Sequence, residues 1–145
     1  MKGLSYFLLV LFLAAISACG QKGRSKDNTT FESDTIIKKT TLKFVSMEHD
    51  FGQVKEGEKV VHTFEVMNTG KADLLLQSVK PSCGCTTPKY EKRPIRPGKK
   101  GTIEVAFDTK GRPGIQRKSI TVVTNTEPSN TVLYFTCEVI PAVNP

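Results

Sequence analysis

The chain has 145 residues, of which 38% are hydrophobic and 24% are charged, and these values are ordinary for one folded domain. They exclude a collagen, a coiled coil and a protein with several membrane spans. The formal net charge is +7 at pH 7. Because glycine and proline are spread between short β-branched runs and no window keeps a helical apolar spacing, the sequence predicts an all-β protein.

The amino terminus resembles a bacterial lipoprotein signal peptide. Lys2 precedes an apolar run from Leu4 to Ile16, which suits a secretory signal but is shorter than the ~20 apolar residues of a spanning helix. Small residues then precede Cys19, as in the lipobox. We therefore expect residues 1–18 to be removed and Cys19 to carry acyl chains such as palmitate, which hold a protein on a bilayer. The alternative is ordinary cleavage after Ala18, with Cys19 as a free thiol.

The next segment, residues 19–41, is predicted to hold the lipidated cysteine and a polar tether. Lys, Ser, Thr, Asn and Asp dominate it, so it lacks the apolar surface that a core requires. No acidic cluster follows Cys19, which favours the periplasmic face of the outer membrane over the cell surface. Asp34-Thr35-Ile36 resembles an O-glycosylation tripeptide. Thr35 is therefore a candidate glycosylation site, and a chance match is the alternative.

Residues 42–141 show short alternating runs separated by turns, and residues 142–145 are left as a tail. Alternation of period two predicts half-buried strands. The residues predicted to face the core are Phe64 and Val66, then Ile103, Val105 and Phe107, then Ile120 and Val122, and finally Leu133, Phe135, Cys137 and Val139. Turn residues separate the runs at 68–71, 81–82, 96–98, 110–114 and 127–130. About seven strands of this kind predict two sheets packed face to face.

Five patches in this region resemble a bacterial family of exported domains of unknown function. The patches are HDFGQV at 49–54, FEVMNTG at 64–70, PSCGCT at 81–86 with its SCGCT motif, IRPG at 95–98 and FDTKG at 107–111. They cover about residues 43–140, and the family is similar to hydin-type and major-sperm-protein-type domains. The resemblance implies a single immunoglobulin-like β-sandwich and assigns no activity.

Cys83-Gly84-Cys85 is the motif in this sequence whose side chains are reactive, and three interpretations of it stay open. In an oxidising compartment the two thiols can pair, because Gly84 permits the bend, and so small a ring would be easily reduced. Two thiolates also suit Cu(I) or Zn²⁺, although His49 and His62 are the only histidines and a structural zinc site has four ligands. The third interpretation is a loop of reduced thiols without chemistry.

The sequence shows no pattern of a known catalytic site. It contains no nucleophile elbow, no phosphate-binding glycine loop and no zinc-protease helix motif. Its carboxylates are scattered over strands and turns, so nothing pairs two of them for acid and base catalysis. We therefore predict no enzymatic activity, no cofactor and no resident metal.

The densest charge lies in a predicted loop with six basic residues and one acid, Glu91. The basic residues are Lys89, Lys92, Arg93, Arg96, Lys99 and Lys100. The loop is either simply solvated or binds an anionic partner such as lipid headgroups, lipopolysaccharide phosphates or an acidic protein face. Nucleic acid is disfavoured, because Tyr90 is the only aromatic there.

Taken together, these patterns predict a non-catalytic, membrane-tethered lipoprotein of the bacterial envelope that binds or scaffolds an envelope partner. The bilayer itself is a partner through acylated Cys19. The alternative function is thiol redox chemistry or copper or zinc handling at Cys83 and Cys85.

Overall fold

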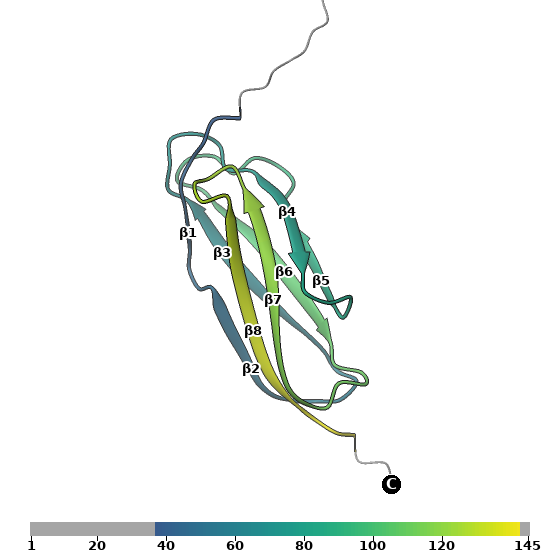
Figure 1. The fold of residues 1–145 in the computed structure, drawn as a ribbon. Helices are drawn as coiled ribbons and strands as arrows, with labels where there is room; N and C mark the ends of the chain where they lie inside the picture. Colours follow the sequence, from purple (N-terminus) through teal and green to yellow (C-terminus); the bar gives the residue numbers. More distant parts are fainter. Residues whose placement is uncertain (1–36, 143–145) are drawn as a thin grey trace, which may run out of the picture. The chain divides into compact units, whose positions relative to one another are not determined.

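The computed structural model describes residues 37–142, which form eight β-strands (Figure 1). The strands are β1 (Leu42–Phe44), β2 (Glu48–Lys55), β3 (Lys59–Asn68), β4 (Leu76–Pro81), β5 (Thr86–Tyr90), β6 (Lys100–Asp108), β7 (Gly114–Thr124) and β8 (Asn130–Ile140). Residues 37–142 contain no helix of the length and apolarity that a membrane span requires. The predicted signal peptide, Cys19, Thr35 and most of the predicted tether lie outside the described residues.

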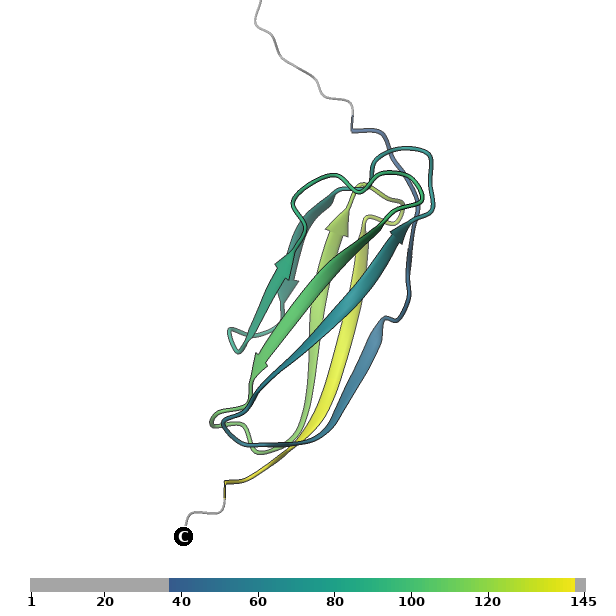
Figure 2. The same cartoon turned by 180° about the vertical axis from the view of Figure 1, so that it is seen from behind.

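The strands form two four-stranded sheets that pack face to face (Figures 1 and 2). One sheet has the order β1-β3-β6-β5 and the other has the order β2-β8-β7-β4. All neighbouring strands are antiparallel except β2 and β8, which are parallel. The chain changes sheet at every connection except those from β5 to β6 and from β7 to β8. The predicted all-β sandwich is confirmed.

The core lies between the sheets and contains every residue that alternation predicts, together with Phe44, Val54, Leu74, Leu76, Val79 and Ile95. All eleven residues predicted to face the core are at most 2% exposed. Full burial of an aliphatic or aromatic side chain of this size contributes roughly 1.5–3 kcal/mol. Both sheets and the whole core lie within residues 37–142, so we expect this part of the chain to fold without the residues before it.

The structure has eight strands where the sequence predicts about seven, because two edge strands lack clean alternation. The register of β2 with β8 shifts between Asp50 and Gln53, around Gly52, whose φ is +66°. Such a bulge moves the side chains after it to the other face. β5 contains Pro88, which donates no ladder hydrogen bond and is tolerated at a sheet edge.

The folded domain begins before residue 42, the residue at which the sequence predicts it to start. Thr40 is buried, and its backbone N–H donates to the Asn125 carbonyl oxygen at 3.1 Å. The Asn125 side-chain amide donates to the Lys38 carbonyl oxygen at 2.8 Å. These contacts use backbone and amide groups instead of apolar side chains, which is why residues 37–41 have the composition of a linker.

Candidate functional site

The six basic residues predicted as one loop are divided between two strands and their connection. Lys89 lies in β5, 3.4 Å from the Glu104 carboxylate, and Lys100 begins β6, 2.8 Å from Glu65. This corrects the predicted loop, because β5 pairs with β6 as far as Tyr90. The connection proper holds the other four residues, Lys92, Arg93, Arg96 and Lys99.

The connection between β5 and β6 keeps its positive charge available to a partner. Arg93 lies 3.6 Å from Glu91 in an exposed pair, which contributes little to stability. Among the described residues, Arg96 and Lys99 have no acidic side chain within ion-pair distance. Lys99 donates its backbone N–H to the Arg96 carbonyl oxygen at 3.0 Å, which fixes the turn that presents both side chains.

A cavity of about 440 Å³ opens beside this connection. It is lined by Arg93, Arg96, Lys99 and Lys100 together with Asp73, Glu91, Pro94 and Ile95. Four cationic and two acidic side chains give the cavity a net positive lining. Its chemistry therefore suits a small anionic group such as a phosphate.

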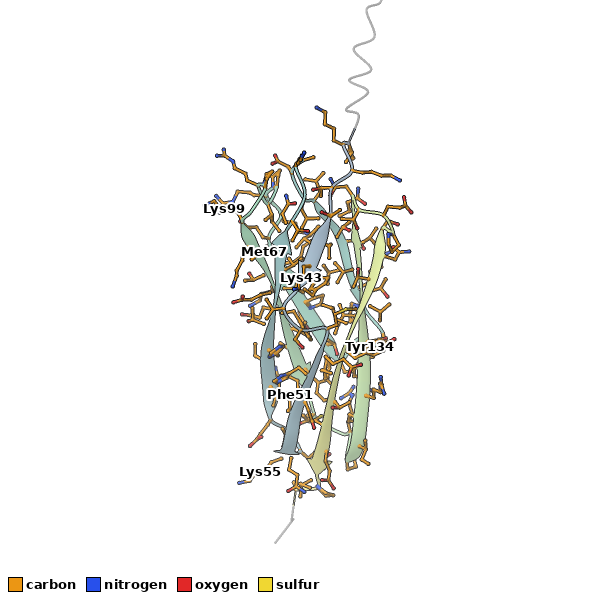
Figure 3. The ribbon with its side chains drawn as sticks, turned by 90° about the vertical axis from the view of Figure 1, so that its left-hand side faces the viewer. Lys43, Phe51, Lys55, Met67, Lys99 and Tyr134 are labelled. Carbon is orange, nitrogen blue, oxygen red and sulfur yellow. A yellow bond between two sulfur atoms is a disulfide. The ribbon has the colours of Figure 1, made fainter. Side chains whose placement is uncertain are left out.

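The described chain begins at the same end of the sandwich as this cavity. Asn125, which holds the first described residues through Lys38, also donates its side-chain amide to the Asp73 carbonyl oxygen at 2.8 Å. Asp73 in turn lines the cavity. Figure 3 shows Lys99 at this end and Lys55 at the opposite one. Any group attached before residue 37 therefore joins the domain beside the basic connection.

A disulfide joins Cys83 to Cys85 in the turn that crosses from β4 to β5, with 5.3 Å between the two α-carbons. Both cysteines are half-buried, and Cys85 packs against the core. The Thr86 hydroxyl oxygen lies 3.5 Å from Cys83 Sγ and 4.0 Å from Cys85 Sγ. In this bonded form neither sulfur is a thiolate ligand for a metal.

Six residues of β3 have a free backbone edge. β1 pairs only with residues 66–68 of β3, and the Val45 N–H extends this contact to the Glu65 carbonyl oxygen at 3.0 Å. Alternate residues of an antiparallel strand direct their backbone groups to the same side. The N–H and C=O groups of Val61 and Thr63 therefore point to the same edge as Glu65, where no described strand pairs with them.

Two histidines and a phenylalanine pack between β2 and the part of β3 that has the free edge. The rings of His49 in β2 and His62 in β3 stack with 3.6 Å between centroids, and Phe51 meets His49 edge-on at 4.5 Å. Burial, followed by the charge of His49, lowers the pKa of His62. The neutral form of His62 is therefore favoured near neutral pH, and the rings serve as packing between β2 and β3.

The structure arranges no metal site in the part of the chain that it describes. No group of three or more His, Cys, Asp or Glu side chains in residues 37–142 is placed to hold an ion. Cys137 is a buried free cysteine in β8, as the alternation predicts. Burial raises the pKa of its thiol, which keeps it in the less reactive protonated form.

Sequence reasoning missed the free edge and the histidine stack. His49 and His62 lie in different sheets, so their contact depends on how the two sheets pack. The free edge depends on the length of β1, which has three residues against the ten of β3. The sequence signal for the early end of β1 is Ser46 and Met47, which follow Phe44 and Val45 and break the apolar run.

Residues 42–139 match the model of a family described as a protein of unknown function (DUF1573). The match covers nearly the same residues as the predicted resemblance and confirms that the chain resembles a family of domains of unknown function. No curated protein matches the chain.

Solved structures with the same fold come from bacteria and from humans. A protein of unknown function from Porphyromonas gingivalis W83 is 21% identical with a TM-score of 0.60, and the match covers 75% of this chain and 51% of that one. This chain thus spans about half the length of that protein. PapD-like domain 7 of human CEP192, an ASH/PapD-like domain, is 15% identical with a TM-score of 0.58, covering 72% of this chain and 88% of that one.

The Vibrio cholerae VesB protease is 14% identical with a TM-score of 0.54, and the match covers 68% of this chain and 31% of the protease. At these identities the likeness shows the fold alone. The fold is an immunoglobulin-like β-sandwich, as predicted, and it is similar to a PapD-like domain.

Proposed function

The chain belongs to the DUF1573 family of proteins of unknown function, and we propose that it is a non-catalytic, lipid-anchored binding module of the bacterial cell envelope. In this proposal residues 1–18 are removed and acylated Cys19 holds the protein on the periplasmic face of the outer membrane. The sandwich then binds an envelope protein close to that membrane. The free edge of β3 is the observation that supports this binding role.

The free edge of β3 is the edge best suited to accept a partner strand. Proteins protect edges with bulges, prolines and short strands. β2 carries the bulge at Gly52, β5 is short and contains Pro88, and the register of β4 with β7 shifts before Ser78. β3 is regular from residue 59 to residue 64, and Val61 on its outer face is 54% exposed. An extended segment of a partner protein pairs with such an edge through main-chain hydrogen bonds.

The substitution Val61→Pro tests strand addition. Proline removes the N–H that points to the free edge and leaves every hydrogen bond to β6 in place. We expect a protein captured from envelope extract by the wild-type chain to bind the variant at least about tenfold more weakly, the effect of losing about 1.4 kcal/mol. Identification by mass spectrometry should be followed by hydrogen exchange on the complex, in which the amides of Val61 and Thr63 exchange more slowly.

The matched control is Val61→Thr, which keeps the N–H and the strand propensity but removes the exposed apolar side chain. We expect this variant to capture the same protein. Both variants are first compared with the wild-type chain by circular dichroism, so that loss of folding is recognised. Equal capture by the wild-type chain and by Val61→Pro, or unchanged amide exchange in the complex, would contradict the proposal.

A second candidate function is thiol–disulfide exchange at Cys83 and Cys85, which the half-buried disulfide in the turn favours. A thiolate of a partner dithiol protein attacks one sulfur, and the other sulfur leaves as a thiolate. The second thiol of the partner then resolves the mixed disulfide. This leaves Cys83 and Cys85 reduced and the partner oxidised.

The reduction potential of this disulfide decides whether it exchanges or is structural. Structural disulfides of exported proteins lie below about −300 mV, and exchanging pairs lie higher. The redox candidate predicts a potential above about −300 mV in equilibrium with a glutathione buffer. It also predicts that the double variant Cys83→Ser, Cys85→Ser loses exchange with a dithiol protein. A lower potential, or a double variant that differs from the parent only in stability, rules this candidate out.

A further inference from the structure

The basic end of the sandwich is the end nearest to the proposed lipid anchor. We call basic end the loops around the start of the described chain, with Lys38, Lys39, Lys71, Lys92, Arg93, Arg96, Lys99 and Lys100. If Cys19 is acylated, residues 20–36 connect it to this end. A segment of that length spans at most about 60 Å when fully extended. The bilayer thus lies within reach of the basic end.

Positive charge is concentrated at this end of the domain. Its eight basic residues are accompanied by four acids, Asp73, Glu91, Glu127 and Glu65, of which Glu65 is paired with Lys100. The loops at the opposite end are nearly balanced, with Lys55, Lys59, Lys110 and Arg112 against Glu56, Glu58 and Asp108. An anionic surface therefore attracts the basic end and orients the domain with the connection between β5 and β6 toward it.

The basic end is built for contact with a charged surface and not for insertion into lipid. Ile37 is the only exposed large apolar side chain near it among the described residues. Arg96 and Lys99 flank a turn in which the Gly98 N–H donates to the Asn68 carbonyl oxygen at 2.9 Å. Asn68 is itself fully buried, so the turn that presents these cations is fixed to the core. Arg96 and Lys99 both line the cavity of about 440 Å³ beside this turn.

We propose that the basic end docks on the anionic phospholipid headgroups of the bilayer that holds the anchor. This inference rests on the lipid anchoring in the proposed function and is independent of strand addition at β3. Docking by the basic end leaves the free edge of β3, at residues 59–64, open to a partner. Each basic side chain near an anionic bilayer changes the affinity by about fivefold.

Vesicle binding by the chain from Gly20 to Pro145 tests this inference without the acyl anchor. The probes are vesicles of phosphatidylcholine alone and of an equimolar mixture with phosphatidylglycerol. We expect binding to the mixed vesicles only, and we expect it to fall as salt is added, because salt screens the attraction. The variant Arg93→Gln, Arg96→Gln, Lys99→Gln should bind them about a hundredfold more weakly, which is about fivefold for each lost charge.

The matched control removes three charges from the opposite end, with Lys55→Gln, Lys59→Gln and Lys110→Gln. It has the same net charge as the basic-end variant, and we expect it to bind the mixed vesicles to within a few-fold of the wild-type chain. Equal losses in the two variants would show that net charge alone acts and would overturn the inference. Failure of the wild-type chain to bind the mixed vesicles would also overturn the inference. If the basic-end variant then loses capture of an acidic protein from envelope extract, the partner of the basic end is that protein and not the lipid.

The outcomes separate this inference from the proposed function. Val61→Pro leaves the basic end intact and should bind vesicles as the wild-type chain does. If vesicle binding fails while Val61→Pro still loses its captured protein, the membrane docking is wrong and the binding module stands.

Discussion

Replacing Phe107 by alanine is expected to lower the free energy of unfolding by about 3–5 kcal/mol. Phe107 is fully buried in β6, and its ring lies 5.2 Å from the Phe135 ring of β8 in the other sheet, measured between centroids. Phe135 in turn packs on Phe51 of β2 at 5.6 Å. The substitution therefore leaves a cavity between the two sheets at the point where three strands meet.

Urea unfolding followed by circular dichroism measures this loss. Ile115→Ala is the control, because Ile115 is 84% exposed on β7 and its truncation should change stability by less than about 0.5 kcal/mol. A loss of under about 1 kcal/mol for Phe107→Ala would contradict the description of a single core shared by both sheets.

Replacing Asn68 by alanine is expected to cost about 3 kcal/mol and to lower the melting temperature by roughly 15 °C. Asn68 is a buried polar residue at the end of β3. Its side-chain amide donates to the carbonyl oxygens of Ala72 and Ile95, both at 2.8 Å. Its side-chain oxygen accepts from Thr40 Oγ1 and from the Gly70 N–H, both at 3.0 Å. Alanine removes all four hydrogen bonds, and the Ile95 carbonyl oxygen then keeps only its bond from the Leu74 N–H.

This substitution also tests whether the core fixes the basic end. Thermal unfolding gives the loss of stability, and hydrogen exchange should show faster exchange of the Gly98 and Lys99 amides. Asn130→Ala is the control, since Asn130 is exposed at the start of β8 and should have little effect. A melting temperature within about 3 °C of the wild-type value, on the scale of about 4–8 °C per kcal/mol, would contradict this role of Asn68.

The sequence predicts the inner strands of the fold better than its edges. β3, β6, β7 and β8 have a neighbour on each side or a long pairing, so their inward residues alternate cleanly, and those that the sequence predicts for the core are all buried. β2 and β5 are edge strands whose bulge or proline breaks the alternation. Lys89 accordingly lies in a strand and not in the predicted loop. The disulfide turn and the basic connection flank β5, one of these edge strands.

The candidate sites depend on contacts between distant parts of the chain. The charge of the basic connection is visible in the sequence, but its position beside the start of the domain depends on Asn125, a residue of the turn after β7. The sequence left three interpretations of Cys83 and Cys85 open, because spacing alone does not fix the bonding of two thiols. In the structure the two cysteines form a disulfide. A measurement of its reduction potential decides whether this disulfide exchanges with other thiols.

Lipid anchoring at Cys19 is the claim on which both the proposed function and the membrane docking rest. The most direct test is the intact mass of the mature protein purified from cell envelopes with detergent, together with the mass of its amino-terminal peptide. The account predicts a chain that begins at Cys19 and carries the added mass of acyl chains, released in part by mild alkali. A chain of unmodified mass with an alkylatable thiol at Cys19 would contradict it, and the domain would then have no anchor to bring its basic end to the membrane.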